Sequence, residues 1–210
     1  MKSEPAPGRR GRSAAAAPVE SSLPRDGRAQ RGARSSRAIV DALLDLVGEG
    51  VVAPTAQQVA ARAQVGLRSV FRHFSDMESL YAAMDERLFA EVAPMLLGGE
   101  PSGDLGRRTR DLIARRVALF ERISPYKRAA NRRRADSTYL TSRHRALVRQ
   151  LRTDLLRWLP ELAKSPDDLV DAVDFLLSFE SWDGLRNDRS LSRARALAAV
   201  ERAVQALVSP

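Results

Sequence analysis

The sequence predicts an all-α fold. Apolar residues recur at helical spacing along most of the chain, and no stretch alternates apolar and polar residues in the way a half-buried strand does. Helix caps and breakers divide the chain into nine helical segments. The first is expected from Ser35 or Ser36 to about Val47, because a single apolar stripe runs along it and glycines follow.

The next two segments are short and lie close together. Thr55 is a good N-cap for a helix over about 56–63. The three residues 64–66 leave room only for a turn, and a second short helix then spans 67–73, which we expect to bury Val70, Phe71 and Phe74. Two short helices joined in this way form a helix-turn-helix, whose second helix can enter a DNA major groove.

Six further helices are expected after this unit. Ser75 and Glu78 have the spacing of a capping box, which opens a fourth helix that ends near Pro94. The others are expected at about 104–123, from Ser124-Pro125 as a short helix, and at 136–159, 166–186 and 190–208.

The residues of the helix-turn-helix stretch resemble the DNA-binding domain of the TetR family of transcriptional regulators. Residues 54–81 keep the spacing of the family pattern without insertions, although they cover only about an eighth of the chain. The matching residues are Thr55, Val59, Ala60, Ala63, Val65, Val70, His73, Phe74 and Leu80.

Four positions depart from the family pattern. Gln64 stands at the turn glycine, Gln57 at a common arginine, and Met77 at the lysine that opens the fourth helix. Phe71 stands at the tyrosine whose hydroxyl reaches a phosphate in the family. Two contacts to the DNA backbone are therefore missing, and such contacts position a protein on DNA and supply much of its affinity.

Composition predicts a disordered basic arm at 1–34, which is rich in Pro, Gly, Ala and Ser and has almost no large apolar residues. The resemblance implies a helix-turn-helix domain at 35–81 and an effector-binding and dimerisation domain at 82–210, and it also implies a function. The implied protein is a homodimeric, cytoplasmic repressor that a small-molecule effector releases from a double-stranded DNA operator. The candidate DNA-binding residues are Arg37, Thr55, Gln57, Leu67, Arg68, Ser69, Phe71, Arg72 and His73.

The same resemblance suggests two further sets of residues in the second half of the chain. Aromatic side chains could line an effector pocket, and two apolar stripes could form a dimer interface, although both patterns are also typical of an ordinary core. The pocket candidates are Phe89, Phe120, Tyr139, Trp158, Phe175 and Phe179. The interface candidates are Leu169, Val173, Leu176, Leu197 and Val204.

Composition excludes several other classes of function. The 210 residues contain no cysteine, which excludes disulfides and thiolate chemistry, and no apolar run is long enough to span a membrane. The two histidines are 71 positions apart without clustered carboxylates, so neither a metal site, a cofactor nor an enzyme is expected. His144 lies between two arginines and is expected to be a solvated helix residue.

The charge of the chain favours polyanion partners. The net charge is +9, and the 1–34 arm carries eight lysines and arginines, so it is expected to contact DNA. Residues 107–152 hold fifteen basic residues against three acids, which is consistent either with an anion site or with a solvated face. The missing phosphate contacts leave one alternative function open, a helical homodimer that acts as a scaffold or general polyanion binder.

Overall fold

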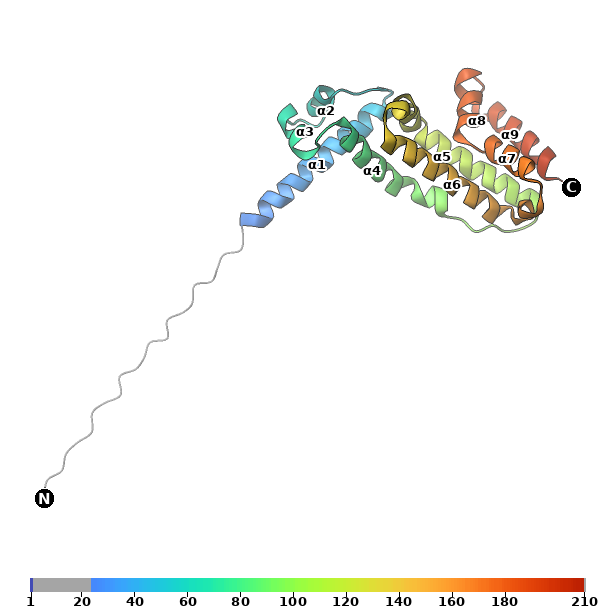
Figure 1. Cartoon of the computed structure of the whole chain (residues 1–210), viewed down its shortest axis with the longest axis horizontal. Coiled ribbons are helices and arrows are strands. Elements are labelled where there is room, and N and C mark those ends of the chain that lie inside the picture. Colours follow the sequence, from blue (N-terminus) through green and yellow to red (C-terminus); the bar gives the residue numbers. More distant parts are fainter. Residues whose placement is uncertain (2–23, 210) are drawn as a thin grey trace.

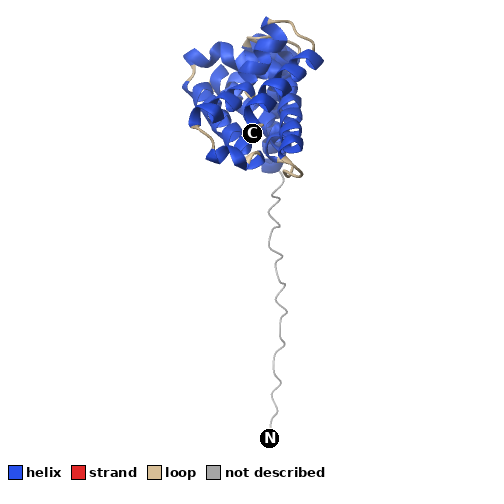
Figure 2. Cartoon of the chain, turned by 90° about the vertical axis from the view of Figure 1, so that its right-hand side faces the viewer, coloured by secondary structure: helices blue, strands red, loops and turns tan. Residues whose placement is uncertain are grey.

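The computed structural model describes Met1 and residues 24–209, and in this part of the chain all regular structure is helical. Figure 2 shows helices joined by loops, with no strand among the described residues. The all-α prediction is therefore confirmed. The helices α1 to α3 lie at one end of the molecule, α5 and α6 form its centre, and α7 to α9 lie at the other end (Figure 1).

Helix α1 spans Pro24–Gly48 and is longer than the sequence predicted. The expectation that residues 24–34 belong to an unfolded arm is wrong, and the rest of that arm lies outside the described residues. Proline is well suited to the first turn of a helix, and the alanines and arginines that follow Pro24 are good helix formers. Extending a helix that already packs through Ile39 and Leu43 therefore needs no second nucleation.

Helices α2 (Ala56–Arg62) and α3 (Leu67–His73) form the expected helix-turn-helix. Thr55 and Gln58 form a capping box, in which the Thr55 side chain accepts from the Gln58 backbone N–H and the Thr55 N–H donates to Gln58 Oε1. The turn between the helices bends at Gln64, whose φ of 54° lies in the left-handed region. A glycine adopts this conformation without strain, whereas a side chain such as that of Gln64 does so at a cost.

Helix α4 spans Met77–Leu97, and its cap is one residue from the predicted one. Asp76 accepts a hydrogen bond of 2.7 Å from the Ser79 N–H, and the Ser79 hydroxyl bonds back to the Asp76 N–H. Glu78, predicted to complete a capping box with Ser75, instead accepts a hydrogen bond from Ser137 at the start of α6. Aspartate is as good an N-cap as serine. Capping by Asp76 and Ser79 leaves Glu78 free to accept the hydrogen bond from Ser137.

Helix α5 spans Leu105–Arg133 and passes through Pro125 without a break. The prediction that a helix ends near residue 123 and a new one begins at Ser124-Pro125 is therefore wrong. Proline removes one backbone hydrogen bond, here to the carbonyl of Glu121. Packing of the buried Ile123 and Ala129 on either side holds the helix together, and the Ser124 hydroxyl donates to the Phe120 carbonyl.

The remaining elements include one long helix and several short ones. A 3₁₀ turn (Arg134–Asp136) leads into α6, which spans Thr138–Trp158 and is capped by Ser137. A second 3₁₀ turn (Pro160–Lys164) precedes α7 (Asp167–Leu176), α8 (Phe179–Asp183), a π-helical turn (Gly184–Asp188) and α9 (Arg193–Val208).

The single helix expected over 166–186 is divided into α7, α8 and the π-helical turn. The Leu177 carbonyl accepts a hydrogen bond from Arg116, and the Ser178 side chain accepts from the Ser181 N–H. Both interactions satisfy backbone groups that a continuous helix would use internally. The chain can therefore leave the α7 axis and begin a new helix.

Two apolar clusters form the core, and two helices contribute to both. One cluster joins α1, α2, α3, the first half of α4 and Ala129 of α5. The other joins the second half of α4 with α5 to α9. Tyr126 of α5 packs against both clusters, and its hydroxyl lies 3.0 Å from the position that a Cβ at Gly48 would occupy. The proposed division at residue 81 thus falls inside α4, a helix that both clusters share.

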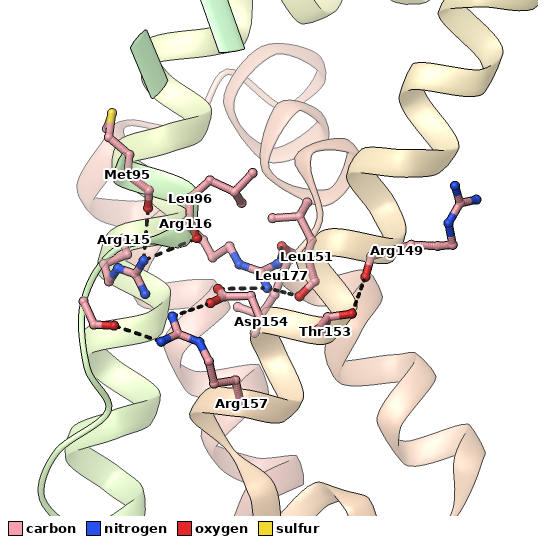
Figure 3. Close-up of polar contacts among 11 residues, drawn as sticks. Met95, Leu96, Arg115, Arg116, Arg149, Leu151, Thr153, Asp154, Arg157 and Leu177 are labelled. Atoms are coloured by element: carbon pink, nitrogen blue, oxygen red, sulfur yellow. Dashed lines mark hydrogen bonds and ion pairs between the residues drawn. The ribbon is translucent and has the colours of Figure 1, made fainter. Parts of the chain in front are cut away.

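A buried arginine joins the centre of the second cluster. The Arg116 guanidinium donates to the carbonyls of Leu151 and Leu177, and it lies 3.7 Å from the carboxylate of Asp154 (Figure 3). Asp154 also accepts a 2.9 Å hydrogen bond from Arg157. This network connects α5, α6 and the end of α7 through the buried Arg116 and Asp154, and it reaches the surface at Arg157.

Candidate nucleic-acid interface and internal cavities

Helix α3 presents one face to the core and the other to solvent. Val70 and Phe74 are 1% and 9% exposed, whereas Leu67 and Phe71 are 38% and 49% exposed. The prediction that Phe71 is buried is therefore wrong. Its place on the helix, between the two buried residues in sequence but rotated away from them, puts an apolar ring on the solvent-facing side.

Two arginines share this outer face. Arg68 and Arg72 are four residues apart, one turn of the helix, and both are exposed. Among the residues that the structure describes, neither forms an ion pair. Arg62 of α2, by contrast, forms a two-bond pair of 2.7 and 2.8 Å with Glu49. The outer face of α3 therefore offers cations that no carboxylate of the described chain neutralises.

The other predicted DNA-binding residues differ in their exposure and in the hydrogen bonds that they already make. Gln57 is exposed on α2, and Thr55 is exposed but committed to its cap. Ser69 is half-buried, and its N–H donates to the Gly66 carbonyl at 2.8 Å. Arg37 is exposed on α1, and its side chain donates back to the Ala33 carbonyl.

His73 is partly enclosed by the protein. Its Nε2 is buried and has no hydrogen-bond partner among the described residues. Its Cε1 lies 4.0 Å from the position of a Cβ at Gly32, so the ring packs beside the first half of α1. This nitrogen can reach a phosphate only if the ring turns.

Seven of the fifteen basic residues of 107–152 are paired with carboxylates of other helical segments. Neither interpretation left open by the sequence, an anion site or a solvated face, includes this pairing. The ion pairs within 4.0 Å are Arg108–Glu161, Arg116–Asp154, Arg122–Glu91, Lys127–Glu180, Arg128–Asp183, Arg143–Asp85, Arg152–Asp171 and Arg152–Asp174. The acids come from outside the segment, which is why its own composition does not reveal them.

A cavity of about 110 Å³ lies between α4, α5 and α6. Its lining combines apolar side chains with basic and polar groups. The apolar lining includes Met84, Leu88, Phe89, Val92, Leu96, Leu119, Ile123 and Tyr126. The polar lining includes Asp85, Lys127, Asn131, Arg134, Arg143, His144 and Gln150.

A second cavity, of about 320 Å³, adjoins the first and lies between α6, α7 and α8. Lys127, His144 and Leu147 line both cavities, so these residues form the wall between them. Glu180 lines the second cavity and approaches Lys127 to 4.0 Å from that side.

The six predicted pocket residues do not line one common cavity. Phe89 lines the first, and Phe175 and Phe179 line the second. Phe120 makes an edge-to-face contact with Phe179 in the core, and the Trp158 ring lies under the Arg115 guanidinium. Tyr139 donates to Asp85, and burial raises the pKa of its hydroxyl to about 12.

Sequence reasoning missed the residues of the wall. His144 is partly buried and accepts a 2.7 Å hydrogen bond from Lys127, so the expectation of a solvated histidine is wrong. Its spacing from the buried Leu140 and Leu151 places it on the inward stripe of α6. That spacing is the signal that could have identified it.

The predicted dimer-interface residues divide into two groups. Val173 and Val204 are fully buried in the core of the single chain, so they cannot contact a second copy. Leu169, Leu176 and Leu197 are partly exposed. The dimer interface itself stays a prediction. On the same helix as Leu169 and Leu176, Phe175, which was predicted as a pocket residue, is 64% exposed on the surface of α7.

Two other kinds of site are absent from the described residues. No group of three or more histidine, aspartate or glutamate residues there could hold a metal ion. None of the described helices combines the length and the hydropathy that a membrane span requires.

Comparison with known proteins gives a likeness to a solved structure. No protein-family model matches the chain, and no curated protein matches it. Among solved structures, the chain is similar to the crystal structure of a transcriptional regulator from Rhodococcus sp. Rha1, with a TM-score of 0.63 and 20% sequence identity. The match covers 84% of this chain and 95% of that one. At this low sequence identity, the structural likeness establishes a shared all-helical fold and nothing further.

Proposed function

We propose that this chain is a DNA-binding transcriptional regulator that responds to a small molecule, and that it acts as a repressor. One observation carries the proposal. The second helix of a helix-turn-helix exposes Arg68, Phe71 and Arg72 on one face while Val70 and Phe74 anchor it to α1 and α4. A short helix held in this way can place side chains against base edges and phosphates in a major groove. The fold shared with a transcriptional regulator supports the same function.

The proposed regulator is a homodimer that binds two half-sites. Two recognition helices must lie about 34 Å apart to reach successive major grooves on one side of DNA. An effector that binds better to a geometry with another separation shifts the population away from the DNA-binding state. Helix α4 is the proposed path of coupling, because it packs in the helix-turn-helix cluster and lines the first cavity.

Selection of bound duplexes from a random pool tests the function. We expect the full-length protein to enrich a sequence with twofold symmetry, and gel filtration with light scattering to give the mass of a dimer. Gln57 can pair with adenine in the major groove, so one A·T preference per half-site should be lost in Gln57→Ala. Binding to every duplex with equal affinity would instead favour the general polyanion binder.

A further inference from the structure

The cavity between α4, α5 and α6 has an excess of positive charge beside an apolar wall. Three cations and one carboxylate line it. The carboxylate, Asp85, is already bonded to Arg143 at 2.6 Å, so this pair is neutral as a unit. Lys127 and Arg134 are left as the cations that no carboxylate of this cavity neutralises.

Lys127 lies in the wall between the two cavities and is largely buried. Its side chain is 10% exposed, and its ammonium group donates to His144 Nδ1, an uncharged acceptor. The nearest carboxylate, Glu180, lies 4.0 Å away on the far side of the wall and is itself 39% exposed. Burial lowers the pKa of Lys127, which shows that the protein around it stabilises its charge less well than water does.

One polar group of the cavity has no hydrogen-bond partner among the described residues. The Tyr81 hydroxyl is buried and makes no hydrogen bond among the described residues, and Tyr81 is 2% exposed. An unpaired buried hydroxyl is uncommon, because losing its hydrogen bond to water costs free energy. Its ring is held in place by the Arg133 guanidinium, 4.6 Å from the ring centre.

These features describe a ligand with two unlike parts. The apolar side chains that α4 and α5 contribute to the lining would cover a hydrocarbon body, and an anionic group of the same ligand would pair with Lys127 of α5. A buried charge is stabilised by a paired and hydrogen-bonded counter-charge. A neutral or cationic ligand of the same shape would leave Glu180, 4.0 Å away and outside this cavity, as the nearest carboxylate of the lysine.

We propose that the cavity binds a small carboxylic acid with an apolar body, and that Lys127 pairs with its carboxylate. The inference rests on the proposed function in one respect, since it names the chemical class of the effector. Arg134 adds to the positive field of the cavity, and the Tyr81 hydroxyl can donate to an oxygen of the ligand.

Calorimetric titration with three matched ten-carbon probes tests this assignment. Decanoate, 1-decanol and decylamine share the hydrocarbon body and differ in the end group. We expect the full-length protein to bind decanoate at least about tenfold more tightly than 1-decanol, which is the scale of one charged hydrogen bond. Equal affinities, or a preference for the amine, would overturn the proposal.

Lysine variants identify the group responsible. Lys127→Met should remove the preference for decanoate while keeping the affinity for 1-decanol, and Lys127→Arg should retain the preference. Lys164→Met is the matched control, because Lys164 is exposed on the 3₁₀ turn after α6. A preference that persists in Lys127→Met, or that is lost equally in Lys164→Met, would contradict the assignment.

A blocked cavity locates the ligand and separates the inference from the proposed function. Ala146 of α6 lines the cavity, so Ala146→Phe should abolish binding of decanoate and 1-decanol if circular dichroism shows the fold unchanged. Undiminished binding would place the ligand elsewhere and overturn the proposal. Operator binding is measured separately without ligand, so a chain that prefers decanoate but selects no DNA contradicts only the proposed function.

Discussion

The guanidinium of Arg116 and the carboxylate of Asp154 lie 3.7 Å apart, with side chains only 3% and 8% exposed. Burial lowers the pKa of Arg116 to about 10, against the effect of Asp154 and Asp174, so the guanidinium remains charged near neutral pH. Its hydrogen bonds to the carbonyls of Leu151 and Leu177 make it a link between three helices.

Removing this charge should be strongly destabilising. In Arg116→Met, two buried carbonyls lose their donor and Asp154 keeps only Arg157, so we expect a loss of about 3–5 kcal/mol in the free energy of unfolding. Urea denaturation measures it. Arg110→Met, at an exposed position of the same helix, should change stability by less than about 0.5 kcal/mol. Equal effects would mean that the buried network contributes nothing.

The left-handed turn at Gln64 should be improved by glycine. A non-glycine residue in this region is strained by about 1–2 kcal/mol. Glycine relieves this strain, but it also increases the conformational entropy of the unfolded chain, which offsets part of the gain. We expect Gln64→Gly to raise the free energy of unfolding by about 0.5–1 kcal/mol. In contrast, Gln57→Gly, inside α2, should lower it by about 1 kcal/mol. A destabilised Gln64→Gly would show that the turn does not strain the side chain.

The wall between the two cavities should make stability depend on pH. Burial, Lys127 and Arg134 lower the pKa of His144, and Glu180 opposes them. As the pH falls, His144 therefore binds a proton in the unfolded chain before it does so in the folded chain, at its ordinary pKa near 6.5. Stability from this group is complete above that value and is lost as the pH falls through the lowered pKa. Melting temperatures from pH 8 to 5 should fall less steeply in His144→Gln than in the wild type.

Two arginines on α3 should have distinguishable roles in DNA binding. Arg68 lies in the first turn, where side chains reach base edges, so Arg68→Ala should relax sequence specificity. Arg72 lies in the last turn, where phosphates are the expected contact, so Arg72→Ala should weaken all sequences about equally. Competition binding with substituted operators measures both, and Arg62→Ala serves as a control because Arg62 is paired with Glu49. Reversed effects would refute the assignment.

The N-terminal basic residues should compensate for Phe71 and Met77, whose side chains cannot donate a hydrogen bond to a phosphate. Deleting residues 1–23 and 1–33 should lower affinity stepwise and flatten the dependence of log affinity on log salt by about 0.9 for each lost contact. The core begins at Ile39, so both truncations should stay folded. Phe71→Tyr in the shorter chain should recover part of the affinity. Identical salt slopes would mean that these residues make no phosphate contact.

The sequence predicted local structure well where short-range chemistry decides it. Thr55, the three-residue turn and the apolar spacing of α3 are sufficient to specify the helix-turn-helix. Prediction from the sequence failed where contacts with a distant part of the chain override a local signal. Pro125 normally ends a helix, but packing on both sides keeps α5 continuous, and Arg116 satisfies the carbonyl at which α7 ends.

The candidate cavity was harder to predict for the same reason. Aromatic content alone does not tell a pocket from a core, and Phe120 and Trp158 are core residues. The groups that distinguish this cavity are Lys127 and His144, which are 17 residues apart in sequence and meet only because α5 and α6 pack against each other.

The close approach of Tyr126 to Gly48 makes the shape of the cavity depend on a residue that does not line it. A methyl group at position 48 would meet the Tyr126 hydroxyl at 3.0 Å, so the ring would have to move. The same ring forms part of the apolar wall of the cavity. Mutations at the end of α1 could thus alter ligand preference during evolution while every residue that touches the ligand stays the same.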